Sequence, residues 1–232
     1  MITLRRSADR RRLKRGLTDT WMTFDPENPV DPLRRGFHAL ELLNEELLAP
    51  ETGAHPQPRD DLEIITYVHE GTLVYQDDAG ELGRLETGEF QRTNLHHGLR
   101  DRTLNASLLD STHIFQSGIA AGGIALTPTQ EKRRFPIADR EGVLRVVVSP
   151  NQLHESLPIR SDVRLYSSIL LLGHHLIHPL ASGRGAWLHV ITGKIRLGSF
   201  DLGVGDSAAL ENEAAISFTA RESAEILLFD LA

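Results

Sequence analysis

Short runs of apolar residues recur along the chain, separated by turns rich in glycine and acidic residues. Residues 64–68 (IITYV) end at the turn Glu70-Gly71, and residues 72–76 (TLVYQ) end at the turn formed by residues 77–80 (DDAG). Strands of this length, spaced by Gly and Asp turns, are typical of antiparallel barrels and sandwiches rather than of helical proteins. The pattern therefore predicts an all-β fold.

The same pattern occurs twice. Residues 68–73 (VHEGTL) resemble residues 190–195 (VITGKI), and residues 85–89 (LETGE) resemble residues 202–206 (LGVGD). Both copies read as strand, Gly turn, strand, Gly-acid turn and strand. A two-copy repeat of a β unit predicts two similar barrels in tandem.

A charged segment that contains prolines, residues 127–136, lies between the two copies. We expect it to be a connector, because proline interrupts strand pairing. The expected division is an N-terminal domain over residues 1–135 and a C-terminal domain over residues 136–232.

Composition narrows the class of protein. The formal net charge of −7 argues against a general affinity for nucleic acid or anionic membranes, and we interpret the basic run in residues 5–15 as a solvated strand and turn. The chain has no cysteine, which excludes disulfides and thiolate chemistry and fits a cytoplasmic location. No secretory signal is present, and the longest apolar run, residues 169–172, is too short to span a bilayer.

The chain resembles the pirin family of bicupins, which includes bacterial proteins similar to quercetin 2,3-dioxygenase. The matching segments are spread over nearly the whole length: residues 5–11, 21–24, 31–32, 36–37, 62–72, 88–91, 132–135, 148–150, 165–167 and 227–231. The resemblance implies a bicupin, with two tandem antiparallel jelly-roll barrels.

The resemblance also implies a position for a functional site. Pirins hold one divalent transition metal, such as Fe, Ni, Mn or Cu, in the N-terminal cupin through a His-x-His pair and a later His-x-Glu pair. In this chain the first pair falls on Gln57 and Arg59, and the second on Asp101 and Thr103. All four family ligands are therefore replaced, and Arg cannot deprotonate to bind a metal. We accordingly expect no metal cofactor.

The replaced positions suggest a site of different character. We expect Gln57, Arg59, Asp101 and Thr103 to line the barrel cavity and to hold a small polar or anionic ligand. We also hypothesise that Arg59 and Asp101 form an ion pair there, because a buried carboxylate requires a compensating charge.

Other histidines offer an alternative set of metal ligands. His55 with Gln57 imitates a His-x-His pair if the register shifts by two residues, and His96 or His97 lies shortly before Asp101. Adjacent strand residues point to opposite sides, so only one of His96 and His97 could join without an irregular loop. The run His174 to His178 is interpreted as turn histidines rather than as a metal site.

The interpretation that we prefer from sequence is a binding or regulatory protein without the dioxygenase activity of the family. Two alternatives remain open: a metal-dependent quercetin 2,3-dioxygenase-like oxidoreductase with a shifted ligand set, and an enzyme with metal-free chemistry. A small ligand and a protein are the expected partners, and neither nucleic acid nor a membrane is expected.

Overall fold

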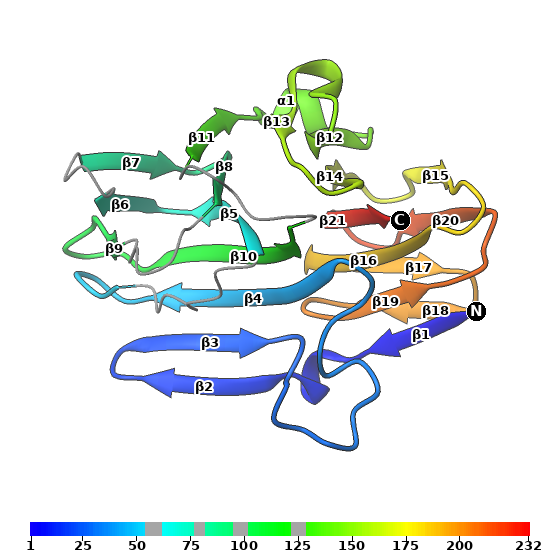
Figure 1. Cartoon of the computed structure of the whole chain (residues 1–232), viewed down its shortest axis with the longest axis horizontal. Helices are drawn as coiled ribbons and strands as arrows, with labels where there is room; N and C mark the ends of the chain where they lie inside the picture. Colours follow the sequence, from blue (N-terminus) through cyan, green and yellow to red (C-terminus); the bar gives the residue numbers. More distant parts are fainter. Residues whose placement is uncertain (54–61, 77–81, 95–101, 122–128) are drawn as a thin grey trace. The chain divides into compact units, whose positions relative to one another are not determined.

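The computed structural model describes residues 1–53, 62–76, 82–94, 102–121 and 129–232 (Figure 1). The chain forms two compact units, each with its own core. The N-terminal unit comprises Arg11–Gly36 and Leu40–Arg134, and the C-terminal unit comprises Met1–Arg10, Phe37–Ala39 and Phe135–Ala232. The domain boundaries expected from sequence, at residues 135 and 136, remain a prediction.

The N-terminal unit is built from two antiparallel sheets. In spatial order, the larger sheet contains β11 (Thr129–Arg134), β8 (Glu89–Asn94), β5 (Leu62–Glu70), β10 (Thr112–Ala120), β4 (Leu40–Leu48), β3 (Thr18–Met22) and β2 (Arg11–Arg15). The smaller sheet contains β7 (Leu82–Glu86), β6 (Thr72–Gln76) and β9 (Arg102–Asn105). A core of buried aliphatic side chains draws on both sheets: Leu48, Val68, Leu73, Leu85 and Ile114.

The expected connector differs from the observed structure. Residues 129–134 form β11, which pairs with β8 from Thr129 opposite Asn94 to Arg134 opposite Glu89. The strand is mostly exposed and carries charged side chains, as edge strands commonly do because charge discourages pairing with other chains. Pro136 lies beyond the end of the strand, so it does not interrupt the pairing.

The C-terminal unit repeats the two-sheet plan. Its larger sheet contains β1 (Ile2–Arg5), β19 (Ser207–Leu210), β16 (Gly185–Thr192), β21 (Ala224–Leu231), β14 (Val163–Leu170), β12 (Arg145–Ser149) and β13 (Leu157–Pro158). Its smaller sheet contains β15 (His175–Pro179), β20 (Ala215–Ala220), β17 (Ile195–Leu197) and β18 (Phe200–Leu202). Three short helical segments complete this unit: η1 (Ser7–Asp9), α1 (Ile137–Arg140) and η2 (Leu153–Glu155).

Apolar side chains fill the interior of the C-terminal barrel. The buried cluster consists of Leu170, Leu180, Ala186, Leu188, Val190, Ile195, Leu197, Leu202, Ala208, Leu210, Ile216, Phe218, Ala220, Ala224, Ile226 and Leu228. Burial of this much apolar surface supplies the main stabilisation of the unit. These aliphatic and aromatic side chains form the packed core in the middle of this barrel.

The repeat seen in the sequence is confirmed by the structure. Gly71 joins β5 to β6, and Gly193 joins β16 to β17. Both glycines have a positive φ, +89° and +70°, which side-chain-bearing residues rarely adopt. The prediction of an all-β fold is also confirmed, since the described helical segments are single turns.

The basic N-terminal run is solvated only in part: Arg5 and Arg10 are buried in the C-terminal unit, whereas Arg11 and Arg12 form ion pairs in the N-terminal unit. Arg11 Nη1 lies 3.0 Å from Asp25 Oδ1, and Arg12 Nη2 lies 2.9 Å from Asp19 Oδ1. The Arg12 guanidinium also lies over the ring of Trp21. Among the residues that the structure describes, none belongs to a helix of the length and hydropathy needed to cross a membrane.

Candidate ligand site in the N-terminal barrel

Of the four positions implied by the family pattern, the structure describes one. Thr103 lies in β9 opposite Tyr75, two residues from the pair formed by Asn105 and the core residue Leu73. Residues two apart share a face of a strand, so Thr103 faces the same side as Asn105, and Tyr75 faces the same side as Leu73. Thr103 is partly buried there.

The remaining predicted site residues lie outside the described part of the chain. They are Gln57, Arg59, Asp101, His55, His96 and His97. Their roles and the proposed ion pair between Arg59 and Asp101 stay predictions. Residues 54–61 immediately precede β5, and residues 95–101 immediately precede β9, so both segments lead directly into barrel strands.

A row of polar side chains crosses the inner face of the N-terminal barrel. On neighbouring strands, Asn44 lies opposite Gln116. Gln116 lies opposite Thr66, which in turn lies opposite Gln91. Thr66 is two residues from Val68, a member of the core, so the row faces the barrel interior. Sequence alternation alone did not single out this row, because its residues are on four strands.

Two amide nitrogens of this row have no hydrogen-bond partner in the part of the chain that the structure describes. Asn44 Nδ2 and Gln91 Nε2 are both buried, and neither has a hydrogen-bond partner among the described residues. Buried polar groups in native proteins are normally bonded to protein, water or ligand, and an unsatisfied one costs about 1–3 kcal/mol. Glu46 adds a fully buried carboxylate two residues from Asn44 along the same face of β4. The row can therefore hold a polar ligand.

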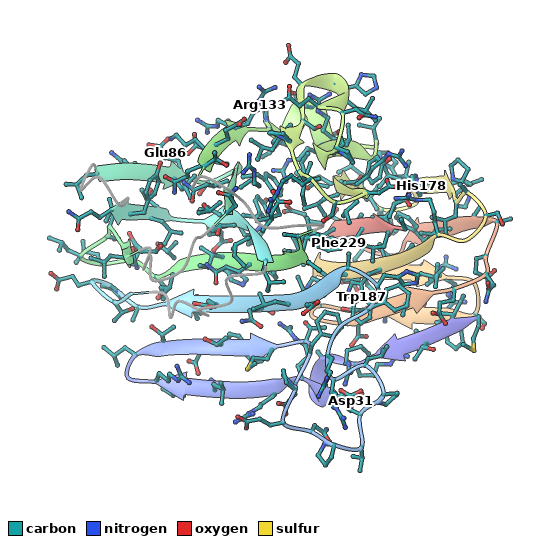
Figure 2. The ribbon with its side chains drawn as sticks, in the orientation of Figure 1. Asp31, Glu86, Arg133, His178, Trp187 and Phe229 are labelled. Atoms are coloured by element: carbon teal, nitrogen blue, oxygen red, sulfur yellow. The ribbon has the colours of Figure 1, made fainter. Side chains whose placement is uncertain are left out.

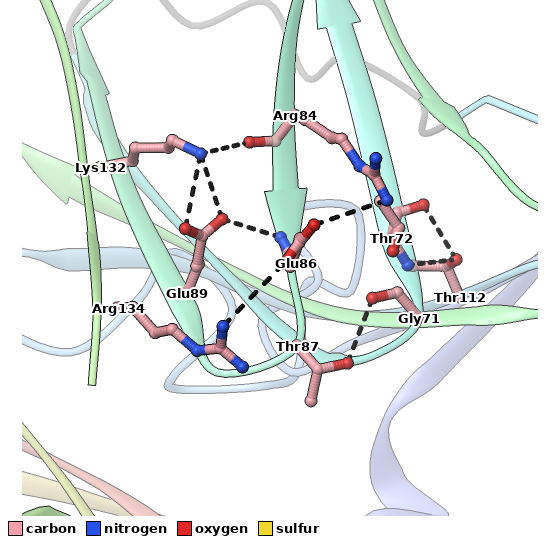
Figure 3. Close-up of polar contacts among 9 residues, drawn as sticks. All are labelled: Gly71, Thr72, Arg84, Glu86, Thr87, Glu89, Thr112, Lys132 and Arg134. Carbon is pink, nitrogen blue, oxygen red and sulfur yellow. Dashed lines mark hydrogen bonds and ion pairs between the residues drawn. The ribbon is translucent and has the colours of Figure 1, made fainter. Parts of the chain in front are cut away.

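Hydrogen bonds brace the strands on one side of this barrel (Figure 3). Thr112 Oγ1 donates to the carbonyl of Thr72 and accepts from its N–H, both at 3.3 Å, which ties β6 to β10. Lys132 Nζ on β11 donates to the carbonyl of Arg84 on β7 at 2.6 Å. These contacts hold the strand framework that carries the polar row.

Exposed ion pairs in the same region contribute little to stability. Glu86 lies 3.5 Å from Arg84 and 4.0 Å from Arg134 (Figure 3). Exposed pairs of this kind stabilise a protein by about 0–1 kcal/mol. We therefore assign them no role in the chemistry of the site.

The C-terminal unit contains a buried ionic network that the sequence pattern did not reveal. His178 Nε2 lies 2.9 Å from Asp230 Oδ2, and Arg184 Nε donates to the other oxygen of the same carboxylate. Burial, the largest single influence, raises the pKa of Asp230, but hydrogen bonds from His178 and Arg184 outweigh it, so that this pKa lies below its ordinary value. His178 is labelled in Figure 2. A charged residue inside the apolar run of residues 226–231 is the signal that could have pointed to this network.

His174 and His175 do not join that network. His175 Nδ1 instead lies 2.9 Å from Thr219 Oγ1 on β20. Across the described ranges, no group of three or more His, Cys, Asp or Glu side chains is arranged to hold a metal ion.

Comparison with known proteins identifies the family. A family profile described as Pirin matches residues 6–119, and one described as the quercetinase C-terminal cupin domain matches residues 146–231. The chain is 34% identical over 231 residues to quercetin 2,3-dioxygenase of Escherichia coli strain K12, covering 100% of this chain and 99% of the relative. This chain belongs to the pirin family.

Solved structures agree with this assignment. The bacterial pirin YhhW from Escherichia coli, in complex with nickel(II), matches with a TM-score of 0.91 and 34% identity, covering 100% of this chain and 99% of that one. The protein YhaK from the same organism matches with a TM-score of 0.76 and 25% identity over 96% of this chain and 93% of its own. The predicted bicupin fold is therefore confirmed.

The expectation that a metal cofactor is absent is wrong. It rested on counting four ligand positions in the family pattern, yet a pirin that matches this chain over its whole length forms a nickel(II) complex. Position counting assumes that ligands stay at fixed places in the sequence. Segments preceding β5 and β9 contain other nitrogen and oxygen donors within a few residues of those places.

Proposed function

We propose that this pirin is a metal-dependent oxidoreductase of the quercetin 2,3-dioxygenase type, with a divalent transition metal in the N-terminal barrel. Full-length similarity to quercetin 2,3-dioxygenase supports the reaction class. The observation that carries the location is the buried polar row, where the amides of Asn44 and Gln91 lack protein partners among the described residues.

The donor types in the two segments that precede β5 and β9 fit such a metal. These segments contain His55, His96, His97 and Asp101, three imidazoles and a carboxylate, which are the donor types of the family site. Imidazole and carboxylate ligands suit Fe, Ni, Mn and Cu. When bound, the metal would supply the Lewis acidity and oxygen chemistry that a flavonol cleavage requires.

The polar row would bind and orient the substrate. Thr66, Gln91 and Gln116 present hydroxyl and amide groups that can hydrogen-bond to the hydroxyls of a polyphenol. The ring of Tyr75 lies against Gly83, where an added Cβ would come within 2.0 Å of the ring. Tyr75 therefore provides an aromatic wall beside Thr103.

Metal analysis combined with quercetin turnover tests this proposal. We expect about one metal per chain after incubation with Fe(II), Ni(II), Mn(II) or Cu(II), and oxygen consumption with quercetin in at least one loaded form. His55→Ala is expected to lower metal occupancy, and so is one of His96→Ala and His97→Ala, since adjacent strand residues point to opposite sides. His175→Ala, which removes an exposed histidine of the C-terminal unit, is the matched control. No bound metal and no turnover under any of these conditions would overturn the proposal.

The second candidate function is a ligand-binding or regulatory protein without dioxygenase turnover. The argument in its favour is the expectation from sequence that Gln57, Arg59, Asp101 and Thr103 take the four positions at which the family pattern has its metal ligands. Saturable quercetin binding by the metal-loaded protein without oxygen consumption would favour this candidate. A protein partner and a cytoplasmic location belong to it as further proposals.

A further inference from the structure

A cavity of about 380 Å³ opens beside β12 in the C-terminal unit. None of its lining residues belongs to the buried apolar cluster of the C-terminal barrel, and none was considered above as a metal ligand. Side chains from α1, β12, η2 and β14 line it, and α1, β12 and β14 lie near one another in Figure 1. A space of this size accommodates a small organic molecule.

One side of the cavity is apolar. Leu144, Val146 and Leu153 line it, and Val146 is almost fully buried. Leu153 is 40% exposed, whereas the leucines of the core are buried. These walls suit a hydrocarbon or aromatic group and would not hold a fully hydrated inorganic anion.

Arg145 supplies a positively charged group in a fixed position. Its Nη2 donates to the carbonyl of His154 at 2.7 Å, and its guanidinium carbon lies 5.5 Å from the ring centroid of Phe135. Its Nε is buried and has no hydrogen-bond partner among the described residues. A guanidinium held this way is pre-organised to bind a carboxylate.

The segment opposite Arg145 has an unusual backbone. Gln152, His154 and Glu155 all have positive φ values, 51°, 49° and 60°, although none is glycine. Such conformations persist only where surrounding contacts enforce them, and they cluster at binding sites. This backbone brings the His154 carbonyl to Arg145 Nη2. It also places Leu153 in the wall of the cavity.

Tyr166 lines the cavity from β14 and offers a neutral hydroxyl. Burial, with a further contribution from the charge of Asp230, raises the pKa of Tyr166 above its ordinary value. Its phenol therefore remains a hydrogen-bond donor at neutral pH. The ring centroids of His178 and Tyr166 are 4.8 Å apart. His178, which is held by its hydrogen bond with Asp230, therefore packs against the Tyr166 ring.

We propose that this cavity is a second ligand site that binds a small aromatic carboxylate carrying a ring hydroxyl. The carboxylate would pair with Arg145, and the ring would lie against the apolar wall and Tyr166. Asp139, an exposed carboxylate that also lines the cavity, would accept a hydrogen bond from the ring hydroxyl. The cavity combines one fixed cation, one hydrogen-bond acceptor and an apolar wall. This combination fits an aromatic hydroxy acid better than it fits a simple anion or a hydrocarbon.

Titration of the full-length protein with 4-hydroxybenzoate tests the proposal, using calorimetry and NMR chemical-shift mapping. We expect saturable binding at one site. Arg145→Gln should weaken it roughly ten- to hundredfold, because a hydrogen bond to a charged group is lost. Tyr166→Phe should weaken it about two- to tenfold, the range for a neutral hydrogen bond.

Arg221→Gln is the matched control, because it makes the same charge change at an exposed position of the C-terminal unit. Leu153→Trp, which fills the cavity from a half-exposed position, should abolish binding even if Arg145→Gln disturbs the fold. Methyl 4-hydroxybenzoate, which lacks the charge, should bind more weakly than the acid.

Three results would overturn the proposal. They are no saturable binding in the millimolar range, equal affinity of the Arg145→Gln and Arg221→Gln variants, and equal affinity of the ester and the acid. Binding that is lost with Asn44→Ala but kept with Leu153→Trp would also overturn it, since the ligand would then occupy the N-terminal barrel. None of these measurements depends on metal loading or turnover, so their failure is separable from that of the proposed oxidoreductase function.

Discussion

Asp230 lies at the centre of a buried ionic network in the C-terminal unit. It accepts hydrogen bonds from His178 and Arg184, and Arg164 Nη1 lies 3.8 Å away. Arg184 also donates to the Asp162 carboxylate at 2.8 Å. Because the Asp230 side chain is only 4% exposed, water does not compensate for the loss of these partners.

Asp230→Asn is expected to lower the free energy of unfolding by about 3–5 kcal/mol at neutral pH, the cost of breaking a buried pair. The pKa of Asp230 in the folded protein lies below its ordinary value of 3.8. The ionised carboxylate of Asp230 therefore stabilises the folded protein fully above pH 3.8. This stabilisation is lost as the pH falls through the folded-state pKa. Urea denaturation between pH 3 and 7 should show that the variant loses less stability on acidification than the parent.

Asp201→Asn provides the contrast for this experiment. Asp201 pairs with Arg196 at 2.7 Å, and the hydrogen bond from Arg196 lowers its pKa, but both side chains are exposed. We expect a much smaller loss of stability than for Asp230→Asn. Equal losses for the two variants would contradict a special role for burial.

Arg140 and Glu225 form a second buried pair in the C-terminal unit. Arg140 Nη1 lies 2.8 Å from Glu225 Oε1, and their side chains are 3% and 9% exposed. Arg140→Met should destabilise the protein by about 3–5 kcal/mol, because it leaves a buried carboxylate without its guanidinium. The double variant Arg140→Met/Glu225→Leu should recover most of this loss in chemical denaturation. A double variant that is as unstable as the two single changes combined would show that the pair itself is a net source of stability.

At the scale of elements, the repeated glycine turn sets the direction of each barrel hairpin. Gly193 joins β16 to β17, and a Cβ there would lie 1.9 Å from the carbonyl oxygen of Ser223. Its counterpart Gly71 would bring a Cβ within 2.5 Å of Thr112 Oγ1. Both positions require glycine for its φ and for its size.

Gly193→Ala should therefore destabilise the protein by several times more than Gly198→Ala. Gly198 also has a positive φ, +56°, but a Cβ there has nothing within 4 Å. Its replacement is expected to cost about 1 kcal/mol, the usual penalty for alanine in this conformation. Thermal unfolding of the two variants separates steric exclusion from backbone strain. Similar melting temperatures would show that the close approach to Ser223 relaxes freely.

At the scale of the whole molecule, two barrels of the same plan differ in what fills them. The N-terminal barrel carries the polar row, with two amides that lack partners among the described residues, whereas an apolar cluster fills the middle of the C-terminal barrel and the buried Asp230 there is paired with His178 and Arg184. A barrel with a polar interior needs a ligand or ordered water to satisfy its groups.

A metal bound in the N-terminal barrel should stabilise the folded chain. If Ni(II) binds only the folded state, a free concentration of about 100 times Kd adds roughly 2.7 kcal/mol to the free energy of unfolding. We expect a higher melting temperature with Ni(II) that EDTA reverses. The shift should disappear in His55→Ala and persist in Asp230→Asn, whose substitution lies in the C-terminal unit. A shift of the same size in His55→Ala would remove His55 from the ligand set.

Much of the fold was predictable because its determinants are local. The turn at Gly71 and the run of residues 64–68 identified β5 and its hairpin, and the second copy identified β16 and β17. β11 was missed, because its charged residues resemble a linker when the partner strand β8 is not considered. The predicted site stays a prediction: Thr103 lies on β9, the other candidate residues lie outside the described part of the chain, and the polar row was not anticipated.

By itself the sequence determined the all-β class, the duplication and the family, because strand alternation, turn glycines and motif order are properties of neighbouring residues. Only the tertiary structure decided which polar groups meet inside. His178 and Asp230 are 52 residues apart, and Arg140 and Glu225 are 85 apart. Strand pairing between distant segments sets such contacts, and so it also sets the polar row and the cavity beside Arg145. No local sequence pattern encodes which of these distant residues come into contact.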